Sequence, residues 1–355
     1  MKKTILTSCV ALLSAFASAQ TDVAPYQPGV TLDGVTYCLP RTAFRVVVTA
    51  EKTTYTPGEF CKYADRYLRL RNISQEPCTQ WKLKTVSMEA YGTPDPSKKY
   101  TIRLNPKTVA PLVELTEDGI LLSINTEGEE ETLGELPKGT KPGKRVNPRD
   151  FMNQEMLSSG STAKMAELVA QEIYTIRESR NALTRGEAEN TPKDGKQLEL
   201  MLKHLSQQEV AFMELFKGFS ETSTEIYSFI VEPNSELDKD VLFRFSNKLG
   251  IVDKDDLCGE PIYISIKDLK VIPEPVYDEK TAKKKVKMET GVYYNVPGRA
   301  QIRIYNQDQT FVEGEFPMGQ FGKVEILSNV LFDKKKSTKV TFHQLSGGIR
   351  TIKDK

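Results

Sequence analysis

The stretch that decides the predicted fold is residues 162–218, TAKMAELVAQEIYTIRESRNALTRGEAENTPKDGKQLELMLKHLSQQEVAFMELFKG. Apolar residues recur every three or four positions on both sides of the polar run GEAENTPKDG, which is the pattern of two amphipathic helices joined by a tight turn. We predict these helices over Thr162–Arg185 and Pro192–Lys217. Thr191 is the expected N-cap of the second helix, and Gly186 is the expected end of the first.

Each predicted helix carries one apolar stripe. The first stripe consists of Met165, Leu168, Val169, Ile173 and Ile176, and the second of Leu198, Met201, Leu202, Leu205, Phe212 and Phe216. Burying these side chains against each other does not offset the conformational entropy lost when both helices become ordered. We therefore expect the helical hairpin to pack on a β-surface or on a partner.

The segments on both sides of the hairpin are typical of antiparallel β-structure. β-Branched and aromatic residues predict strands over Val35–Ala50, Trp81–Tyr91 and Tyr100–Leu104, and the turn Glu117–Gly119 divides a predicted β-hairpin over Leu112–Asn125. The last third of the chain contains further strands at sandwich-like spacing. The predicted fold class is α+β, with mainly antiparallel, sandwich-like β-domains and an inserted long helical hairpin.

The composition divides the chain into five predicted segments. They are a signal peptide (1–19), an N-terminal β-domain (20–126), a charged linker or loop (127–150), the helical hairpin (151–219) and a C-terminal β-domain (220–355). The linker is rich in glutamate, lysine and arginine and contains few apolar residues, so it buries too little surface to order itself.

Two short segments of the predicted β-domains resemble each other. Residues 34–43 read GVTYCLPRTA, and residues 291–300 read GVYYNVPGRA, so Gly, Val, Tyr, Pro and Ala coincide without a gap. Our hypothesis is that two related β-domains flank the helices. The alternative is a chance similarity between two segments that each lead into a strand.

The first residues have the three parts of a secretory signal peptide. Two lysines precede the apolar run Ile5–Phe16, and Ala17–Ala19 provides a small-x-small cleavage site. The apolar run is too short to span a bilayer, and Cys9 lies inside it, so a lipid anchor is not predicted. No later stretch of the sequence is long and apolar enough to cross a membrane. We expect an exported protein, periplasmic or extracellular.

Charge and cysteine content restrict the classes of partner and cofactor. The 49 basic and 48 acidic side chains leave a net charge of +1, which does not indicate a nucleic-acid partner. No Cys-x-x-Cys occurs, and the only two histidines, His204 and His343, are far apart in the sequence. We therefore predict no metal site and no cofactor.

Four cysteines remain after the predicted cleavage site, and they allow three complete disulfide pairings. They are Cys38, Cys61, Cys78 and Cys258. An exported chain permits disulfides, and Cys61 with Cys78 is the preferred pair because these two residues lie close together in the sequence.

Arg177 and Arg180 are the candidate binding residues. They lie three positions apart on one side of the first predicted helix, where two guanidinium groups suit a carboxylate or a phosphate. The alternative is that they pair with Glu199 or with other acids of the second helix. We predict no catalytic residue, because neither His204 nor His343 has a nucleophile nearby in the sequence.

Several phrases of the sequence together resemble a known family. They are Tyr37–Arg45, Tyr55–Tyr67, Ser161–Arg180, Asp194–Gly195, Leu215–Gly218, Val292–Ala300 and Gln320–Leu327. The chain resembles uncharacterised exported proteins of Bacteroidetes bacteria that are grouped as a domain of unknown function. The resemblance covers nearly the whole mature chain and implies export in a Gram-negative cell. It implies no activity, ligand or catalytic residue.

Two functions are therefore weighed. The first is a non-enzymatic binding or interaction protein of the bacterial envelope, with an envelope glycan or a protein as its partner. The second is an envelope glycan or peptidoglycan hydrolase that uses a pair of carboxylates. A deep pocket with two close carboxylates would favour the enzyme, and an apolar groove beside the helices would favour binding.

Overall fold

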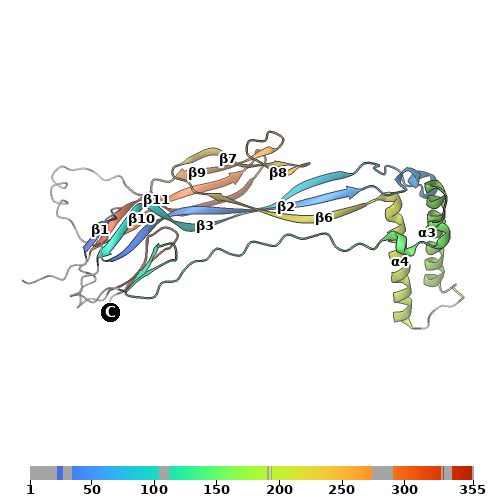
Figure 1. Cartoon of the computed structure of the whole chain (residues 1–355), viewed down its shortest axis with the longest axis horizontal. Helices are drawn as coiled ribbons and strands as arrows, with labels where there is room; N and C mark the ends of the chain where they lie inside the picture. The colour runs from blue at the N-terminus through green and yellow to red at the C-terminus, as the bar shows by residue number, and fades with distance from the viewer. Residues whose placement is uncertain are drawn as a thin grey trace, which may run out of the picture.

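The computed structural model shows an elongated molecule, with β-sheets at one end and long helices at the other (Figure 1). The fold class is α+β, as predicted, and the sheets are antiparallel. The structure describes residues 22–26, 34–103, 112–189, 192, 194–273, 291–328, 331 and 338–353. The predicted signal peptide lies outside the described residues.

The first sheet contains four strands in the order β1-β3-β2-β6. Their bounds are Asp22–Pro25 for β1, Gly34–Thr56 for β2, Cys78–Arg103 for β3 and Phe219–Val231 for β6. The predicted strand Trp81–Tyr91 and residues 100–103 of the predicted strand Tyr100–Leu104 are parts of the single strand β3, and Leu104 lies outside the described residues. We call the three-stranded part that leads to the helices the arm; it consists of residues 51–56 of β2, 78–82 of β3 and 219–224 of β6.

The second sheet packs face to face on the first and completes a β-sandwich. Its order is β11-β10-β9-β7-β8, with β7 at Leu237–Ser246, β8 at Gly250–Val252, β9 at Glu260–Asp268, β10 at Gly291–Tyr305 and β11 at Thr310–Ser328. Alternate residues face inward, as a two-residue strand period requires. The shared core contains Phe44, Val46, Val48, Phe243, Ile262, Ile264, Ile266, Ile302 and Ile304.

A third, smaller sheet covers the end of the sandwich that lies away from the helices. Its order is β13-β12-β5-β4, with β4 at Val113–Leu115, β5 at Leu121–Ile124, β12 at Lys339–Phe342 and β13 at Ile349–Lys353. The pair β4–β5 confirms the predicted hairpin, and Gly119 has the positive φ of 84° that favours glycine in the turn. This sheet packs on residues that include Tyr37, Leu39, Ile102 and Val292.

The two long helices agree with the prediction except at one end. Helix α3 spans Thr162–Arg185 as predicted, and α4 spans Gly195–Lys217. The predicted start of the second helix at Pro192 is therefore three residues too early. Asp194 is the N-cap, and its carboxylate accepts a hydrogen bond from the Lys196 backbone N–H at 3.0 Å. Aspartate caps a helix at least as well as threonine, which explains why α4 begins after Asp194 and not after Thr191.

Four short helices accompany the long pair. They are η1 (Cys61–Tyr63), α1 (Ala64–Leu68), η2 (Pro148–Phe151) and α2 (Gln154–Leu157). No helix within the described residues is both long and apolar enough to span a membrane.

Residues 127–147, which we call the strap, run beside the arm from the third sheet to the helices (Figure 1). They contain neither helix nor strand. The strap is nevertheless held at several points along its length: the backbone carbonyl of Gly134 accepts a hydrogen bond from Arg45, and that of Thr140 accepts one from the Thr224 N–H at 3.0 Å. Since β6 is an edge strand, the strap covers part of its free edge.

Strands from both sides of the helical hairpin share the first sheet, because β6 follows the hairpin in the sequence and pairs with β2, which precedes it. The predicted domain boundaries after residues 126 and 219 stay a prediction about which units fold independently.

The two similar segments occupy comparable positions. Residues 34–43 begin β2 and residues 291–300 begin β10, and each of these strands pairs with the next strand in the sequence. Beyond the segments, however, the gap-free alignment matches Phe44, which faces the core, with Gln301, which does not belong to the core. A one-residue offset exchanges the two faces of a strand. The duplication hypothesis therefore needs such an offset, and it stays a hypothesis.

The buried hydroxyl of Tyr37 ties the first sheet to the second. Tyr37, in β2, is fully buried. Its hydroxyl accepts a hydrogen bond from the Tyr293 N–H of β10 at 2.9 Å and donates one to the Tyr293 carbonyl at 3.1 Å. The Tyr100 ring stacks on the Tyr293 ring with a centroid distance of 4.3 Å. This tie lies at the end of β2 opposite the arm.

Removing the Tyr37 hydroxyl is expected to destabilise the fold. Tyr37→Phe deprives two backbone groups of Tyr293 of a buried partner, so the free energy of unfolding should fall by about 1–3 kcal/mol in a urea titration. Tyr26→Phe is the matched control, because Tyr26 is 40% exposed; its effect should stay within about 0.5 kcal/mol. Equal stability of Tyr37→Phe and the wild type would contradict the role of the tie.

The same residue predicts a loss of stability at alkaline pH. Burial raises the pKa of the Tyr37 hydroxyl well above its usual value of about 10. Above about pH 10 the unfolded chain therefore binds fewer protons than the folded protein, and stability falls as pH rises. We expect a shallower fall in Tyr37→Phe, measured by urea titrations at about pH 8, 10 and 11. Parallel curves for the two proteins would refute this contribution.

Candidate functional site

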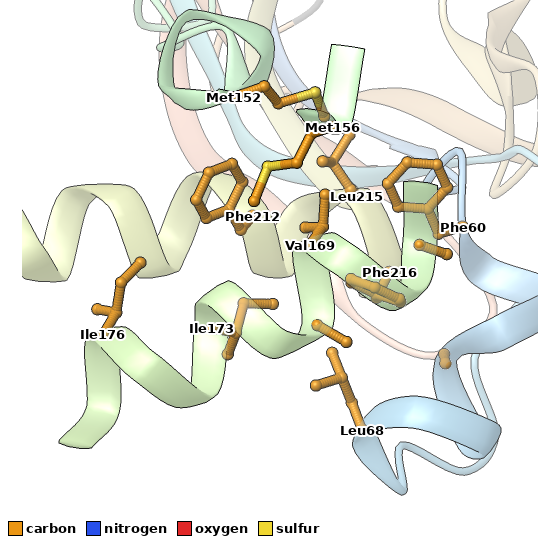
Figure 2. Packing of buried hydrophobic residues seen from close by; sticks show 13 residues of the cluster. Phe60, Leu68, Met152, Met156, Val169, Ile173, Ile176, Phe212, Leu215 and Phe216 are labelled. Carbon is orange, nitrogen blue, oxygen red and sulfur yellow. The ribbon is translucent and has the colours of Figure 1, made fainter. Parts of the chain in front are cut away.

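The helices form a separate unit at the end of the arm, which we call the head; it comprises η1, α1, η2, α2, α3 and α4 (Figure 1). Figure 2 shows its core, in which Val169 and Ile173 of α3 lie near Phe212 and Phe216 of α4. The short helices supply the remaining side chains of this core: Phe60 just before η1, Leu68 of α1, Met152 just after η2, and Met156 of α2. The helical hairpin thus packs on short helices of its own chain, whereas we expected a β-surface or a partner.

The head is joined to the arm by close backbone contacts. The Phe60 N–H donates to the Leu215 carbonyl at 2.7 Å. A Cβ atom at Gly58 would lie 2.3 Å from that same carbonyl oxygen, so only glycine permits this approach. The Tyr55 hydroxyl donates to the Lys217 carbonyl at 3.0 Å. The ends of β2 and α4 are therefore locked together.

Arg177 and Arg180 lie side by side on α3 and share one acid on α4. Arg177 Nε lies 2.7 Å from Glu209 Oε1, and Arg180 Nη1 lies 2.6 Å from Glu209 Oε2. Glu209 is mostly buried, with 13% of its side chain exposed. Its carboxylate occupies the position between the two guanidinium groups where an external anion would bind. The partner is Glu209 rather than the expected Glu199, and binding of an anion by this pair stays a prediction.

The choice of Glu209 shows how far the two helices are offset. Arg177 lies 185 − 177 = 8 residues before the end of α3, and Glu209 lies 209 − 195 = 14 residues after the start of α4. The difference of 6 residues corresponds to about 9 Å of helix. The first turns of α4 therefore project beyond α3 (Figure 1). Leu200 and Met201 on this projecting part are 55% and 38% exposed.

An apolar groove of about 320 Å³ lies between α4 and the end of the strap. Val146, Val210 and Ala211 provide its apolar surface, and Val146 and Val210 are 48% and 55% exposed. Its remaining lining residues are Arg145, Lys203, Ser206, Gln207 and Glu214.

Arg145 fixes the strap side of the groove. Its Nη2 donates to Glu214 at 2.8 Å, and its guanidinium group lies 3.1 Å from the centre of the Phe219 ring. The sequence did not indicate this groove, because Val146 belongs to a segment whose composition predicts only a loop.

The predicted disulfide between Cys61 and Cys78 is absent, and both residues are free, as are Cys38 and Cys258. Cys61 opens η1, whereas Cys78 opens β3 and lies opposite Tyr55. The helical turns between the two cysteines keep their thiols apart, so a short sequence separation was an insufficient criterion for a disulfide. Burial raises the pKa of Cys38, and a hydrogen bond with Asp256 raises that of Cys258.

The two histidines belong to different parts of the molecule. His204 lies on α4 in the head, and His343 follows β12 in the third sheet. Among the described residues, no three histidine, cysteine, aspartate or glutamate side chains are grouped so that they would hold a metal ion.

A larger hollow of about 720 Å³ lies where β10 and β11 meet the chain around His343. Glu131 and Glu325 are two of its lining residues. The Tyr294 hydroxyl donates to Glu325 at 3.2 Å, and Lys323 lies 2.6 Å from the same carboxylate. Glu325 is therefore held by a hydrogen bond and an ion pair within the protein itself.

A family model described as a domain of unknown function (DUF4831) matches residues 33–350. The chain belongs to this family. The DUF4831 match therefore includes the second sheet, the arm, the strap and the head, together with the first sheet except β1 and the third sheet except most of β13. No curated protein and no solved structure matches the chain. The roles of residues in this DUF4831 protein are accordingly argued from its own geometry.

Removing the shared acid is expected to turn the arginine pair into an anion site. In Glu209→Ala the two guanidinium groups repel each other, and because the ion pair is partly exposed the free energy of unfolding should fall by about 1 kcal/mol. Replacing chloride by phosphate at equal ionic strength should raise the melting temperature of this variant more than that of the wild type.

Glu199→Ala is the control, because it removes an exposed carboxylate from the same helix; it should respond to phosphate as the wild type does. If the wild type binds phosphate and the double variant Arg177→Ala/Arg180→Ala does not, the pair is instead a native anion site.

Proposed function

We propose that this protein is an exported, non-enzymatic interaction protein of the bacterial envelope and that its head binds a protein partner. The groove beside α4 is the observation that supports the proposal. In it Val146 and Val210 are exposed to solvent, and the head that contains it is held at the end of the arm. Exposed apolar patches rimmed by polar residues are typical of protein–protein contact sites.

The groove offers a partner both affinity and orientation. Val146 and Val210 provide apolar area that a partner side chain removes from water. Lys203 lies on the rim, as do Arg145 and Glu214, which already pair with each other. A partner with an apolar anchor and an acid placed against Lys203 fits this arrangement, because charges at the rim of an interface set specificity and orientation.

The projecting part of α4 extends the same surface. Leu200 lies ten residues before Val210, and Lys203 and Gln207 lie between them on the same side of the helix at helical spacing. The exposed side of α4 therefore presents apolar residues both at its tip and beside the strap. A partner helix lying along α4 would contact both places.

The geometry of the arm supports the same function. Of the 23 residues of β2, residues 51–56 belong to the arm, and they span about 20 Å at about 3.3 Å per residue. The head is thereby displaced from the sandwich core, which leaves the groove accessible to a partner.

The hydrolase alternative needs two carboxylates on either side of a cleft, about 5–5.5 Å or about 6.5–9.5 Å apart. The groove contains one carboxylate, that of Glu214, and Arg145 holds it in an ion pair. No observation on the head favours the hydrolase, and it stays an untested alternative.

Export rests on the signal-like sequence of residues 1–19. Expression in a Gram-negative host tests it: export predicts a mature chain that begins at Gln20 and is released with the periplasmic fraction. An intact N-terminus in the cytoplasmic fraction would refute this part of the proposal.

Photo-crosslinking tests the groove directly. Benzoylphenylalanine replacing Val210 is expected to give one discrete adduct in envelope preparations. The same probe at Glu178, an exposed position on α3, should give none. Val210→Lys should weaken binding of the purified partner by about tenfold or more, because it places a charge on the apolar surface. No adduct at Val210, or equal adducts at both positions, would remove the support for the proposal.

A further inference from the structure

A hollow on the outer face of the second sheet has a different character from the groove on the head. It measures about 600 Å³, which lies within the range of small-ligand sites. Its lining residues come from β7, β9 and β10 and from the turn before β7: Glu236, Leu237, Asp238, Ser265, Ile266, Lys267, Gln301, Arg303 and Tyr305.

Two cross-strand pairs and Tyr305 form the floor of this hollow. Strands β9 and β10 place Lys267 opposite Gln301, Ser265 opposite Arg303, and Tyr263 opposite Tyr305. The residues that alternate with them, such as Ile264 and Ile302, belong to the sandwich core. Because side chains alternate along a strand, these six side chains point away from the core.

An irregularity in β7 builds the wall. The pairing of β7 with β9 jumps between Leu237 and Asp240. Lys239, inside this jump, has a positive φ of 54°, and its N–H donates to the Ser265 hydroxyl at 3.2 Å. The one extra residue bends the start of β7 and increases its local twist. The hollow is thus a built feature and not merely the solvated side of a flat sheet.

The polar side chains of the hollow are held in place by their neighbours. Gln301 Nε2 donates to Glu313 at 2.9 Å, which leaves its carbonyl oxygen as an acceptor. Arg303 Nη2 donates to the Thr310 hydroxyl at 3.2 Å. The Tyr305 and Ser265 hydroxyls lie 3.1 Å apart. Donors and acceptors therefore stand at fixed spacings, as recognition of a ligand with several hydroxyl groups requires.

Aromatic rings border one side of this polar set. The Tyr263 and Tyr305 rings lie 5.8 Å apart with an angle of 37° between their planes. The guanidinium group of Arg303 lies 5.2 Å from the centre of the Tyr305 ring. A tyrosine ring offers an apolar face together with a polar edge. A sugar has the same two characters, because its C–H face is apolar and its hydroxyl edge is polar.

Charge and strand order select the class of ligand. Two carboxylates among the lining residues, of Glu236 and Asp238, balance two cations, of Lys267 and Arg303. The carboxylate of Glu313 lies 3.7 Å from Arg303 and adds a negative charge at the border, so the hollow has no excess of positive charge to attract an anionic ligand. Strands β9 and β10 both lie inside the sheet. A peptide therefore has no free strand edge on the floor of the hollow to which it would add.

We propose that this hollow is a binding site for a neutral glycan, which stacks a sugar ring on Tyr305 and bonds its hydroxyl groups to Gln301, Arg303 and Ser265. The site lies on the sandwich and is independent of the protein-binding groove on the head. It gives the protein a second ligand of a different chemical class.

The full mature chain is titrated with a panel of neutral disaccharides, namely cellobiose, maltose, xylobiose and diacetylchitobiose, by isothermal calorimetry. At least one should bind saturably with a Kd below about 1 mM. Tyr305→Leu should weaken that binding by about tenfold or more, because it removes the stacking ring, whereas Tyr305→Phe keeps the ring and should change it by about threefold or less.

Gln301→Ala keeps the test valid even if Tyr305→Leu fails to fold, and it should weaken binding about fivefold or more. Arg299→Ala is the matched control, because Arg299 lies on the same strand and outside this hollow; its affinity should change by about twofold or less. Three results would overturn the proposal. They are the absence of saturable binding to any disaccharide, tighter binding of acidic sugars than of neutral ones, and binding that survives both Tyr305→Leu and Gln301→Ala.

Discussion

The backbone hydrogen bonds and the buried side chains of strand β2 together connect the three sheets to the head. The first residues of this strand contribute Tyr37 and Leu39 to the core of the third sheet, the middle contributes Phe44 to the sandwich, and the chain just beyond it contributes Phe60 to the head. β2 pairs with β3 on one side and with β6 on the other. A slip of one residue would turn Phe44 outward, so the register of β2 also fixes where the head stands.

The sequence predicted elements whose periodicity is long and unbroken. Both helices are of this kind, and the turn Glu117–Gly119 indicated the hairpin of β4 and β5. It did not predict that β3 is one strand, because Pro94 and its glycine and aspartate neighbours resemble a turn. In the structure Pro94 lies opposite Pro40, where the pairing of β2 with β3 shifts in register. Proline is tolerated at such an irregularity, where a regular ladder hydrogen bond is not required.

The candidate sites were less predictable, because they depend on contacts between distant segments. Two arginines at helical spacing were visible in the sequence, but the identity of their partner depended on the 9 Å offset of the helices, about 6 residues at 1.5 Å each. The groove on the head needed Val146 of the strap to lie beside Val210 of α4. The hollow on the second sheet needed the irregular start of β7. Neither the composition of a loop nor the alternation of residues along a strand shows which distant residue will lie beside it.

The arm also has a mechanical character. In the arm, β2 runs antiparallel to both β3 and β6, and all three strands point along the long axis of the molecule (Figure 1). A force that pulls the head away from the sandwich therefore acts along the strands and perpendicular to their hydrogen bonds. Under such a load the hydrogen bonds share the force together instead of opening one after another. A molecule built in this way transmits tension between the sandwich and the head as a stiff tether.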